Sequence, residues 1–248
     1  MTKEEIQTYI NEQIASIGLN QEYKLEFAKI RQVKSPQKSY DAAGWDFYVP
    51  ENLNITDFTK NFGIYSNENL VRKQDAQSPA FLIKNKNDNR ELWIKFKKDD
   101  KGNIVYINCN SGLQIIPEWN KWIEDKNTVV MSIDLAFGEK ILIPSGIHVN
   151  LPKNVYLKVE NKSGVASKRG LIFGADVIDQ DYQGEMHINL INVCNNISII
   201  NAGDKIVQML ALFQPIMRET KEYSSIDELY KNKKSERGSD GFGSTDKK

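Results

Sequence analysis

The chain has 248 residues, and its 33 lysines and arginines balance its 33 aspartates and glutamates, so its formal net charge is zero. A general nucleic-acid binder usually carries a basic excess, so we do not expect that class of protein. With 40% hydrophobic and 27% charged residues, the composition is that of an ordinary globular protein, and the length suits one large domain or a core domain with an insert.

The cysteines, histidines and apolar runs further restrict the expected cellular location and the kinds of site that the chain could hold. Cys109 and Cys194 are too few for a disulfide framework, and both lie in apolar strand-like runs, which favours buried free thiols. The two histidines, His148 and His187, make a His-rich metal site within one chain unexpected. No apolar run is long enough to cross a bilayer, and the first residues lack the features of a signal peptide. We therefore expect a cytoplasmic protein (host cytoplasm if the gene is viral) with no membrane partner.

Residues 1–22 are predicted to form an N-terminal helical extension. Thr2 and Glu5 have the spacing of a capping box, which begins many helices. Apolar residues then recur at helical spacing in a single stripe, namely Ile6, Tyr9, Ile10, Ile14 and Ile17. We expect this stripe to pack on the main body of the chain.

Two segments, 23–50 and 128–230, are dense in short strand-like runs bounded by turn residues, which predicts an all-β barrel or sandwich. The runs of the second segment outside its central turn are residues 129–135, 139–143, 146–151, 155–160, 188–193, 197–200 and 206–213. In the first segment, Asp46 stands between Trp45 and Phe47 in a half-buried strand. A buried carboxylate must be paired, hydrogen-bonded or near a metal, so structural and functional roles for Asp46 are equally open from this position alone.

The intervening residues, 51–127, have a different sequence pattern, which predicts an inserted, β-rich subdomain. A strand pair at 92–96 and 104–108 flanks a turn that ends at Gly102, and a short helix is expected near 117–125. The insert therefore separates the two β-rich segments that would form the main domain.

The chain is organised around residues 174–184, which lie between an apolar run at 171–173 and an alternating run at 186–190. This pattern predicts a strand, a tight turn and a second strand, with glycines at both ends of the turn. The turn holds three carboxylates and one tyrosine, including Asp179 and Tyr182. A carboxylate on a rigid hairpin is well held for proton transfer, although Asp and Gly are also common in ordinary exposed turns.

The tail, 231–248, contains one large apolar side chain, Phe242, and is expected to be mobile when free. Glycines around Phe242 expose backbone N–H groups, Ser244 and Thr245 add hydroxyls, and Arg237 adds a fork of donors. Such groups suit a phosphate, while Phe242 could stack on a flat base. We predict a mobile lid; for these residues taken alone, a solvated tail is the alternative.

Five segments, in this order, resemble motifs of the homotrimeric deoxyuridine triphosphatases (dUTPases). They are Ala43-Gly44-Trp45-Asp46-Phe47-Tyr48, Lys162-Ser163-Gly164-Val165-Ala166, residues 174–184, Gly203-Asp204-Lys205-Ile206-Val207-Gln208-Met209-Leu210, and residues 237–245. The resemblance leaves out the N-terminal helix and the insert. It implies a jelly-roll-like β fold assembled as a homotrimer, with each active site built from three subunits. It also implies hydrolysis of dUTP to dUMP and pyrophosphate, with Mg²⁺ on the triphosphate.

The resemblance also implies catalytic roles for individual residues. Asp179 would be the general base that deprotonates the water attacking the α-phosphorus. Gln208 would position that water and the α-phosphate, and Ser163, with Gly164, would donate to the phosphate chain. Asp46 would hold Mg²⁺ through a coordinated water, because Mg²⁺ keeps several waters and needs few protein ligands.

Substrate binding would involve the central turn and the tail. Tyr182 would lie beneath the deoxyribose and leave no room for a 2′-hydroxyl. The main chain from Ala175 to Ile178 would bond the uracil edge, and Phe242 of the closed tail would stack on the base. The phosphate contacts of the closed tail would come from Arg237, Gly243, Ser244 and Thr245.

The sequence departs from the family's pattern at several positions, and two of these departures bear most directly on the expected site. Lys162 stands where the family usually has Arg, which keeps the positive charge and loses the planar fork. Asp176 stands where Gly is common in the uracil-binding turn, so its side chain must point away from the base.

Two alternative functions remain open. A dCTP deaminase would share the fold, but its chemistry relies on a Glu at the place that holds Asn189 here. A regulatory protein of the dUTPase fold would act through a protein partner bound to the insert, although the expected catalytic residues are all present in this chain.

Overall fold

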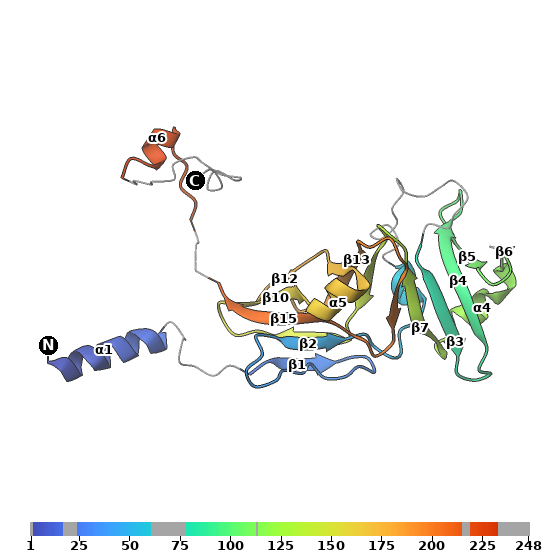
Figure 1. Cartoon of the computed structure of the whole chain (residues 1–248), viewed down its shortest axis with the longest axis horizontal. Coiled ribbons are helices and arrows are strands. Elements are labelled where there is room, and N and C mark those ends of the chain that lie inside the picture. The colour runs from blue at the N-terminus through green and yellow to red at the C-terminus, as the bar shows by residue number, and fades with distance from the viewer. Residues whose placement is uncertain (1, 17–23, 61–77, 113, 215–218, 233–248) are drawn as a thin grey trace. The chain divides into compact units, whose positions relative to one another are not determined.

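The computed structural model describes residues 2–16, 24–60, 78–112, 114–214 and 219–232 (Figure 1). The chain divides into two compact units, Met1–Gln214 and Pro215–Lys248. Strands pair in antiparallel fashion throughout the described sheets, so the predicted all-β, jelly-roll-like class is confirmed. Five residues of the predicted lid lie outside the described residues, namely Arg237, Phe242, Gly243, Ser244 and Thr245.

A four-stranded sheet at the centre of the first unit carries most of the expected motifs. Its strands lie in the order β12 (Val177–Ile178), β10 (Val155–Asn161), β15 (Lys205–Phe213) and β2 (Trp45–Tyr48), as Figure 1 shows. Side chains alternate between buried and partly exposed positions along β10, which is the pattern of a strand with one face on the core. The sheet thereby brings residues from distant parts of the chain to one surface.

Two smaller sheets complete the main domain. β13 (His187–Asn192) lies between β11 (Leu171–Phe173) and β8 (Lys140–Pro144), and β1 (Glu26–Lys29) pairs with β9 (Ile147–Asn150). The predicted pairing of the strands on either side of the central turn is confirmed, because Phe173 faces Leu190.

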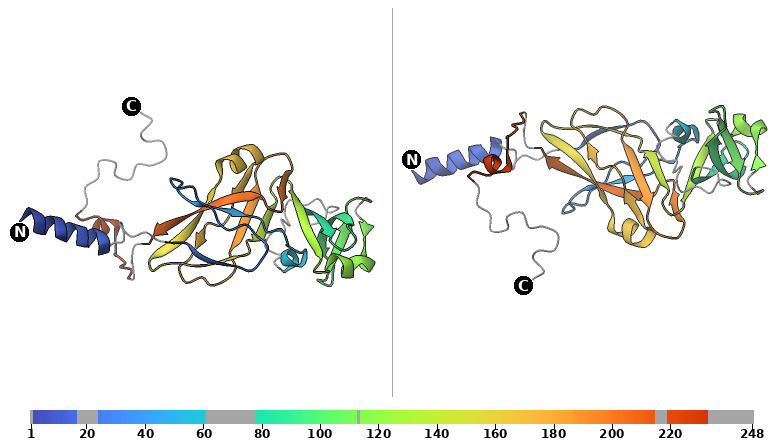
Figure 2. Two further views of the ribbon diagram at one scale, coloured as in Figure 1. Left: turned by 90° about the horizontal axis from the view of Figure 1, so that it is seen from below. Right: turned by 90° about the horizontal axis from the view of Figure 1, so that it is seen from above.

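Described residues of the predicted insert, 51–127, extend β7 (Thr128–Leu135) into a six-stranded sheet. β7 pairs with β14 (Ser198–Asn201) on one edge and with β3 (Ala80–Asn85) on the other, and β4 (Glu91–Lys98), β5 (Ile104–Asn108) and β6 (Gln114–Ile115) follow (Figure 2). The predicted β4–β5 pair and the helix near residue 117 are confirmed, the latter as η1 (Pro117–Trp119) and α4 (Asn120–Ile123). Buried aromatic and aliphatic residues from both the insert and the main domain form one core cluster, for example Phe47, Phe81, Ile133 and Met209.

The helices are short apart from the first. α1 (Lys3–Ser16) begins with the predicted capping box, in which the Glu5 N–H donates to Thr2 Oγ1 at 3.2 Å and the Thr2 N–H donates to the Glu5 carboxylate at 2.7 Å. Its stripe residues Ile6, Tyr9 and Ile10 are 45, 55 and 42% exposed, and the packing of this stripe on the main body stays a prediction. Among the described helices, none combines the length and the apolar character needed to span a membrane.

In the part of the chain that the structure describes, the remaining helices are α2 (Thr56–Thr59), α5 (Ser163–Arg169) and α6 (Ile226–Leu229). α6 is capped by Ser225, whose side chain accepts a hydrogen bond from the Glu228 N–H. Cys109 and Cys194 are free, as predicted, but both are half-buried and not fully buried.

Candidate active site

Asp46 is the centre of a charged cluster on the four-stranded sheet. Its carboxylate accepts hydrogen bonds from Lys162 Nζ and, at 2.9 Å, from Lys205 Nζ. Partial burial disfavours the ionised form of Asp46, but the two ammonium groups outweigh this effect and hold its pKa below the ordinary value. The sequence-based requirement for a partner is therefore met by two lysines, and Asp46 remains ionised at neutral pH.

Gln208 lies beside Asp46 because the strands bring the two residues opposite each other. Asp46 on β2 faces Gln208 on β15, which in turn faces Glu160 on β10. The Gln208 amide donates to the Asn161 carbonyl at 3.2 Å, so its side chain is directed toward the end of β10. A β-carbon on Gly44 would lie 2.6 Å from the Met209 carbonyl oxygen, so only glycine lets the segment before β2 approach β15 this closely.

The second motif forms a helix that the sequence reasoning missed. α5 begins at Ser163 directly after β10, with Lys162 at the N-cap and Ser163 and Gly164 exposed in its first turn. The first N–H groups of a helix have no partner within the helix and carry a partial positive charge, which favours anions. Lys162, Ser163 and Gly164 therefore lie together with Asp46 and Gln208, and this part of the site presents donors suited to phosphate.

The central turn is more elaborate than the predicted hairpin. Val177 and Ile178 leave the β11–β13 pair and form β12, in which Ile178 faces Leu157 of β10. Asp179 follows directly and is exposed, and Tyr182 is 42% exposed. The turn is closed by two hydrogen bonds: the Tyr182 N–H donates to the Asp179 carbonyl at 3.2 Å, and the Tyr182 hydroxyl donates to the Glu185 carbonyl at 2.8 Å.

The residues expected at the uracil edge lie just before Asp179. Ala175 is exposed, while Ile178 is half-buried and packs against the core. The Asp176 carbonyl accepts the Val159 N–H at 2.7 Å, which fixes the backbone at the position where the family commonly has glycine. The backbone between Ala175 and Ile178 is thus held against the edge of β10.

The structure separates the expected residues into two groups within one chain. Asp46 is level with Glu160 of β10, and Asp179, one residue beyond the Ile178–Leu157 pair, is level with Tyr156. Three strand spacings and four residues along the strands separate Asp46 from Asp179. With about 4.8 Å between strands and about 3.3 Å per residue, the α-carbons of the two residues are roughly 20 Å apart.

The described residues hold no group of three or more His, Cys, Asp or Glu side chains that could bind a metal ion. Asp46 is therefore a single hard oxygen donor whose two oxygens are engaged by ammonium groups. Such a donor suits an ion that is already coordinated by phosphates and waters, since Mg²⁺ needs few protein ligands.

Three charged residues near the site were not assigned a role from the sequence. Lys205 lies within the fourth motif, where strict alternation would place it on the same face as the buried Val207. A register shift between Lys205 and Val207 changes this alternation, and no sequence pattern indicated it. Glu185 follows the central turn directly, and Arg31 lies 154 positions earlier in the sequence, so no local pattern could join them.

Comparison with known proteins assigns the family. The dUTPase family model matches residues 128–246. Deoxyuridine 5′-triphosphate nucleotidohydrolase of Maricaulis maris is 37% identical over 116 residues, which cover 46% of this chain and 71% of that protein. The Variola virus protein of the same name is 36% identical over 110 residues, covering 44% of this chain and 68% of that protein. This chain is thus a β protein of the nucleotide-hydrolase class, and it belongs to the dUTPase family.

Other matches are more partial or more distant. The human mitochondrial deoxyuridine 5′-triphosphate nucleotidohydrolase is 36% identical over 111 residues, and the match spans only 40% of that protein. A mutant dUTPase of Staphylococcus bacteriophage 80alpha, solved with dUpNHpp, has 16% identity and a TM-score of 0.47 over 90% of this chain and 99% of its own. A mutant dUTPase of phage phi11, described with a structural Mg(II) ion, has 14% identity and a TM-score of 0.45 over 83% of this chain and 99% of its own. Since both TM-scores are below 0.5, the family assignment rests on the sequence relatives.

Proposed function

We propose that this protein hydrolyses dUTP to dUMP and pyrophosphate through attack of water on the α-phosphorus. The observation that carries the proposal is the grouping of Asp46, Gln208 and Lys162 at the start of α5. This grouping offers cations, an amide and helical N–H groups to a phosphate chain, together with one carboxylate for a metal ion. Membership of the dUTPase family supports the same substrate.

The phosphate chain would be bound along the first turn of α5. Ser163 and Gly164 would donate to its oxygens, and the ammonium group of Lys162 would provide the charge usually provided by arginine. Gln208 would position the α-phosphate and the attacking water. Such catalysis depends mainly on positioning the phosphate chain and the water and on stabilising the negative charge of the transition state, because phosphoryl transfer requires little covalent chemistry from the protein.

The water would be deprotonated by Asp179, and the deoxyribose would lie on Tyr182. Both side chains belong to an exposed turn that is held by hydrogen bonds at its base, so they are accessible to a nucleotide and fixed relative to each other. The main chain of Ala175 to Ile178 would bind the uracil edge. A tyrosine ring against the sugar leaves a 2′-hydroxyl without space or partner, which would exclude UTP.

The residues of the first group fit a Mg²⁺ ion that enters with the triphosphate. When bound, the ion would neutralise charge on the phosphate oxygens. Asp46 would hold it through a coordinated water. Lys162 and Lys205 would then transfer their hydrogen bonds from Asp46 to the phosphates, so the carboxylate and the two ammonium groups would all contribute to substrate binding.

A homotrimer would join the two groups of residues that one chain keeps apart. Because Asp46 and Asp179 are roughly 20 Å apart within the sheet, a nucleotide that contacts both would need Asp179 from a neighbouring subunit. The tail, 231–248, would close the site as a lid, with Phe242 on the base. The division into an N-terminal extension, a β domain, an insert at 51–127 and a lid remains part of this proposal.

A direct assay separates this proposal from its alternatives. The purified protein is incubated with dUTP or dCTP and Mg²⁺, and pyrophosphate and ammonia are measured. We expect pyrophosphate from dUTP and no ammonia from dCTP. Asn189 supports this expectation, since its side-chain oxygen is buried without a partner among the described residues and an amide cannot shuttle a proton. Ammonia from dCTP would indicate a deaminase, and neither product would indicate an interaction protein that acts through its insert.

A further inference from the structure

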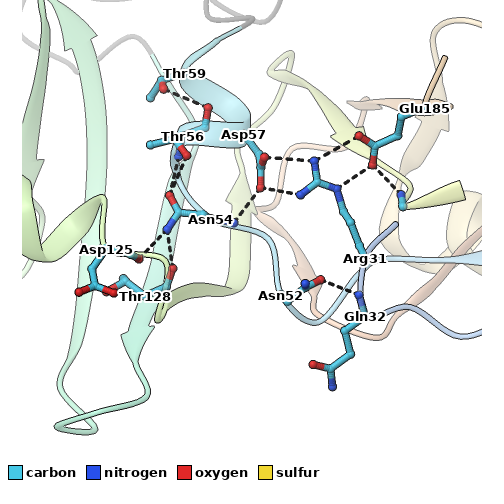
Figure 3. Close-up of polar contacts among 11 residues, drawn as sticks. Arg31, Gln32, Asn52, Asn54, Thr56, Asp57, Thr59, Asp125, Thr128 and Glu185 are labelled. Carbon is cyan, nitrogen blue, oxygen red and sulfur yellow. Dashed lines mark hydrogen bonds and ion pairs between the residues drawn. The ribbon is translucent and has the colours of Figure 1, made fainter. Parts of the chain in front are cut away.

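A half-buried arginine, Arg31, joins the inserted segment to the central turn. The guanidinium of Arg31 lies between two carboxylates, as Figure 3 shows. Its Nε and Nη2 donate to the two oxygens of Glu185 at 2.7 and 3.2 Å, and its Nη1 and Nη2 donate to the two oxygens of Asp57 at 3.0 and 3.1 Å. Arg31 is thus bound in a bidentate manner on both sides, which fixes its plane and the directions of both acids.

Burial and further hydrogen bonds make the geometry of this cluster specific. The side chains of Arg31, Asp57 and Glu185 are only 19, 12 and 14% exposed. Each carboxylate also accepts a backbone N–H, from Asn54 at 2.9 Å for Asp57 and from Gly146 at 2.8 Å for Glu185. Gly146 has a φ of +73°, and a β-carbon there would lie 2.8 Å from Arg31 Cβ, so the close approach of the two segments requires glycine.

Glu185 also anchors the turn that carries Asp179, the residue expected to act as the general base. Its carbonyl oxygen accepts the Tyr182 hydroxyl at 2.8 Å and lies 2.8 Å from His187 Nδ1. The Tyr182 N–H in turn donates to the Asp179 carbonyl. The side chain of Glu185 therefore holds the turn to the body, while its backbone holds Tyr182, so a change in the direction of the side chain would move the ring and the Asp179 peptide together.

Asp57 connects the same cluster to both ends of the insert. It lies in α2, where the insert leaves the main domain, and its partner Asn54 uses its side-chain amide to donate to the carbonyls of Asp125 and Thr128, at 2.8 Å each. Thr128 begins β7, where the insert returns to the main domain. The entry and exit of the insert are thus tied to each other and to Arg31 (Figure 3).

We propose that Glu185 is a positioning residue for the Asp179–Tyr182 turn, and that Arg31 and the insert residue Asp57 set its orientation and thereby the discrimination between deoxyribose and ribose. This inference rests on the proposed function, because it assigns the turn to sugar selection and water activation. It gives the insert a role in the reaction through α2, whether or not a partner binds to it.

The test compares Asp57→Asn and Glu185→Gln with wild type and with the control Glu91→Gln. Glu91 forms an ion pair with Lys84 within the insert, 3.1 Å apart, and neither residue belongs to the Arg31 cluster. For each protein, kcat/KM is measured with dUTP and with UTP in the presence of Mg²⁺. We expect the dUTP-to-UTP ratio to fall between about threefold and thirtyfold in the two cluster variants, the range of coupling through packed networks, and to stay unchanged in Glu91→Gln.

The ratio distinguishes positioning from stability. A variant that only reduces the fraction of folded protein lowers both kcat/KM values equally and leaves their ratio constant. As a second measurement, hydrogen exchange of backbone amides 179–185 is followed in the substrate-free protein. We expect faster exchange there in Asp57→Asn and not in Glu91→Gln.

The outcomes separate this inference from the proposed function. If wild type hydrolyses dUTP and Asp57→Asn changes neither the ratio nor the exchange, the inference is wrong and the proposed function stands. If wild type does not hydrolyse dUTP, the proposed function fails, and the exchange measurement still decides whether Asp57 holds the turn: unchanged exchange would overturn that link as well.

Discussion

Replacement of Arg31 by methionine tests how strongly the charged cluster stabilises the fold. Methionine fills much of the same volume but leaves Asp57 and Glu185 facing each other without a cation, each less than 15% exposed. Two ionised carboxylates in that position lose their shared partner and repel each other. The change therefore removes one partner from a buried pair, the situation in which the remaining charge is costly.

The expected loss follows from the burial of these groups. Breaking a buried ion pair by removing one partner destabilises proteins by about 3–5 kcal/mol. For a chain of this size, 1 kcal/mol shifts Tm by about 2–4 °C. We therefore expect Arg31→Met to lower Tm by about 6–20 °C at neutral pH, with a smaller loss for Arg31→Lys, which keeps a charge but cannot bind both carboxylates in a bidentate manner.

The loss should depend on pH in a defined direction. In wild type, burial raises the pKa of Glu185, but the hydrogen bonds from Arg31 and from the Gly146 N–H, with the Arg31 charge, outweigh burial and hold the pKa below its ordinary value of 4.5. Its stabilisation is therefore present above the unfolded pKa and is lost as the pH falls through the folded one. In Arg31→Met, burial and the charge of Asp57 raise this pKa, so the variant loses stability as the pH rises. The difference between the two proteins should therefore shrink as the pH falls through the raised pKa of the variant and on through the lowered pKa of wild type.

The assay is urea unfolding of wild type, Arg31→Met and the double variant Arg31→Met/Glu185→Gln at pH 7 and pH 4. If an unpaired charge causes the loss, the double variant should recover about 1 kcal/mol or more of the free energy of unfolding at pH 7. A double variant less stable than Arg31→Met, or a loss that is equal at both pH values, would show that packing around Arg31 and not charge pairing is responsible.

Three further predictions concern the two halves of the site. Asp179→Asn should bind dUTP and turn it over at least about a hundredfold more slowly, and near-normal turnover would reject Asp179 as the base. Gly184→Ala places a β-carbon 2.4 Å from the Tyr182 hydroxyl oxygen, an exposed side-chain end that can move. We expect a loss of stability of about 1 kcal/mol or less, which keeps Tm within a few degrees of wild type. In a competition assay, the variant should exclude UTP less strongly than wild type does. Asp46→Asn should raise the Mg²⁺ concentration for half-maximal activity about tenfold or more, and an unchanged magnesium titration would remove Asp46 from metal binding.

Local patterns predicted those parts of the fold that local interactions determine. The capping box at Thr2 and Glu5, the strands β7, β10 and β13, and the turn at Gly102 all follow from spacing and backbone preference, and all are found. The requirement that Asp46 be paired was also correct, because the cost of burying a charge does not depend on which residue pairs with it.

The missed elements depend on contacts between distant residues. α5 contains Ser163, Gly164 and Ser167, which are poor helix formers, and its burial of Val165 and the left-handed cap at Gly170 stabilise it instead. β12 has only two residues, so it exists through its pairing with β10 and has no periodicity of its own. Elements this short, without a regular spacing of apolar residues, cannot be recognised from the sequence pattern.

The site shows the same division between local and distant information. The motifs were found because each occupies a short stretch of sequence, yet their grouping depends on strand order. The order β12-β10-β15-β2 brings Asp46 and Gln208 together and leaves Asp179 two strands beyond Gln208. No rearrangement of side chains can span roughly 20 Å. If the chain hydrolyses dUTP with Asp179 as base, we expect its active site to combine residues of more than one subunit. Mixing Asp46→Asn chains with Asp179→Asn chains, at a Mg²⁺ concentration too low for Asp46→Asn alone, should then restore activity. Failure of such mixed assemblies to regain any activity would place all catalytic residues within one chain and contradict the separation derived from the sheet.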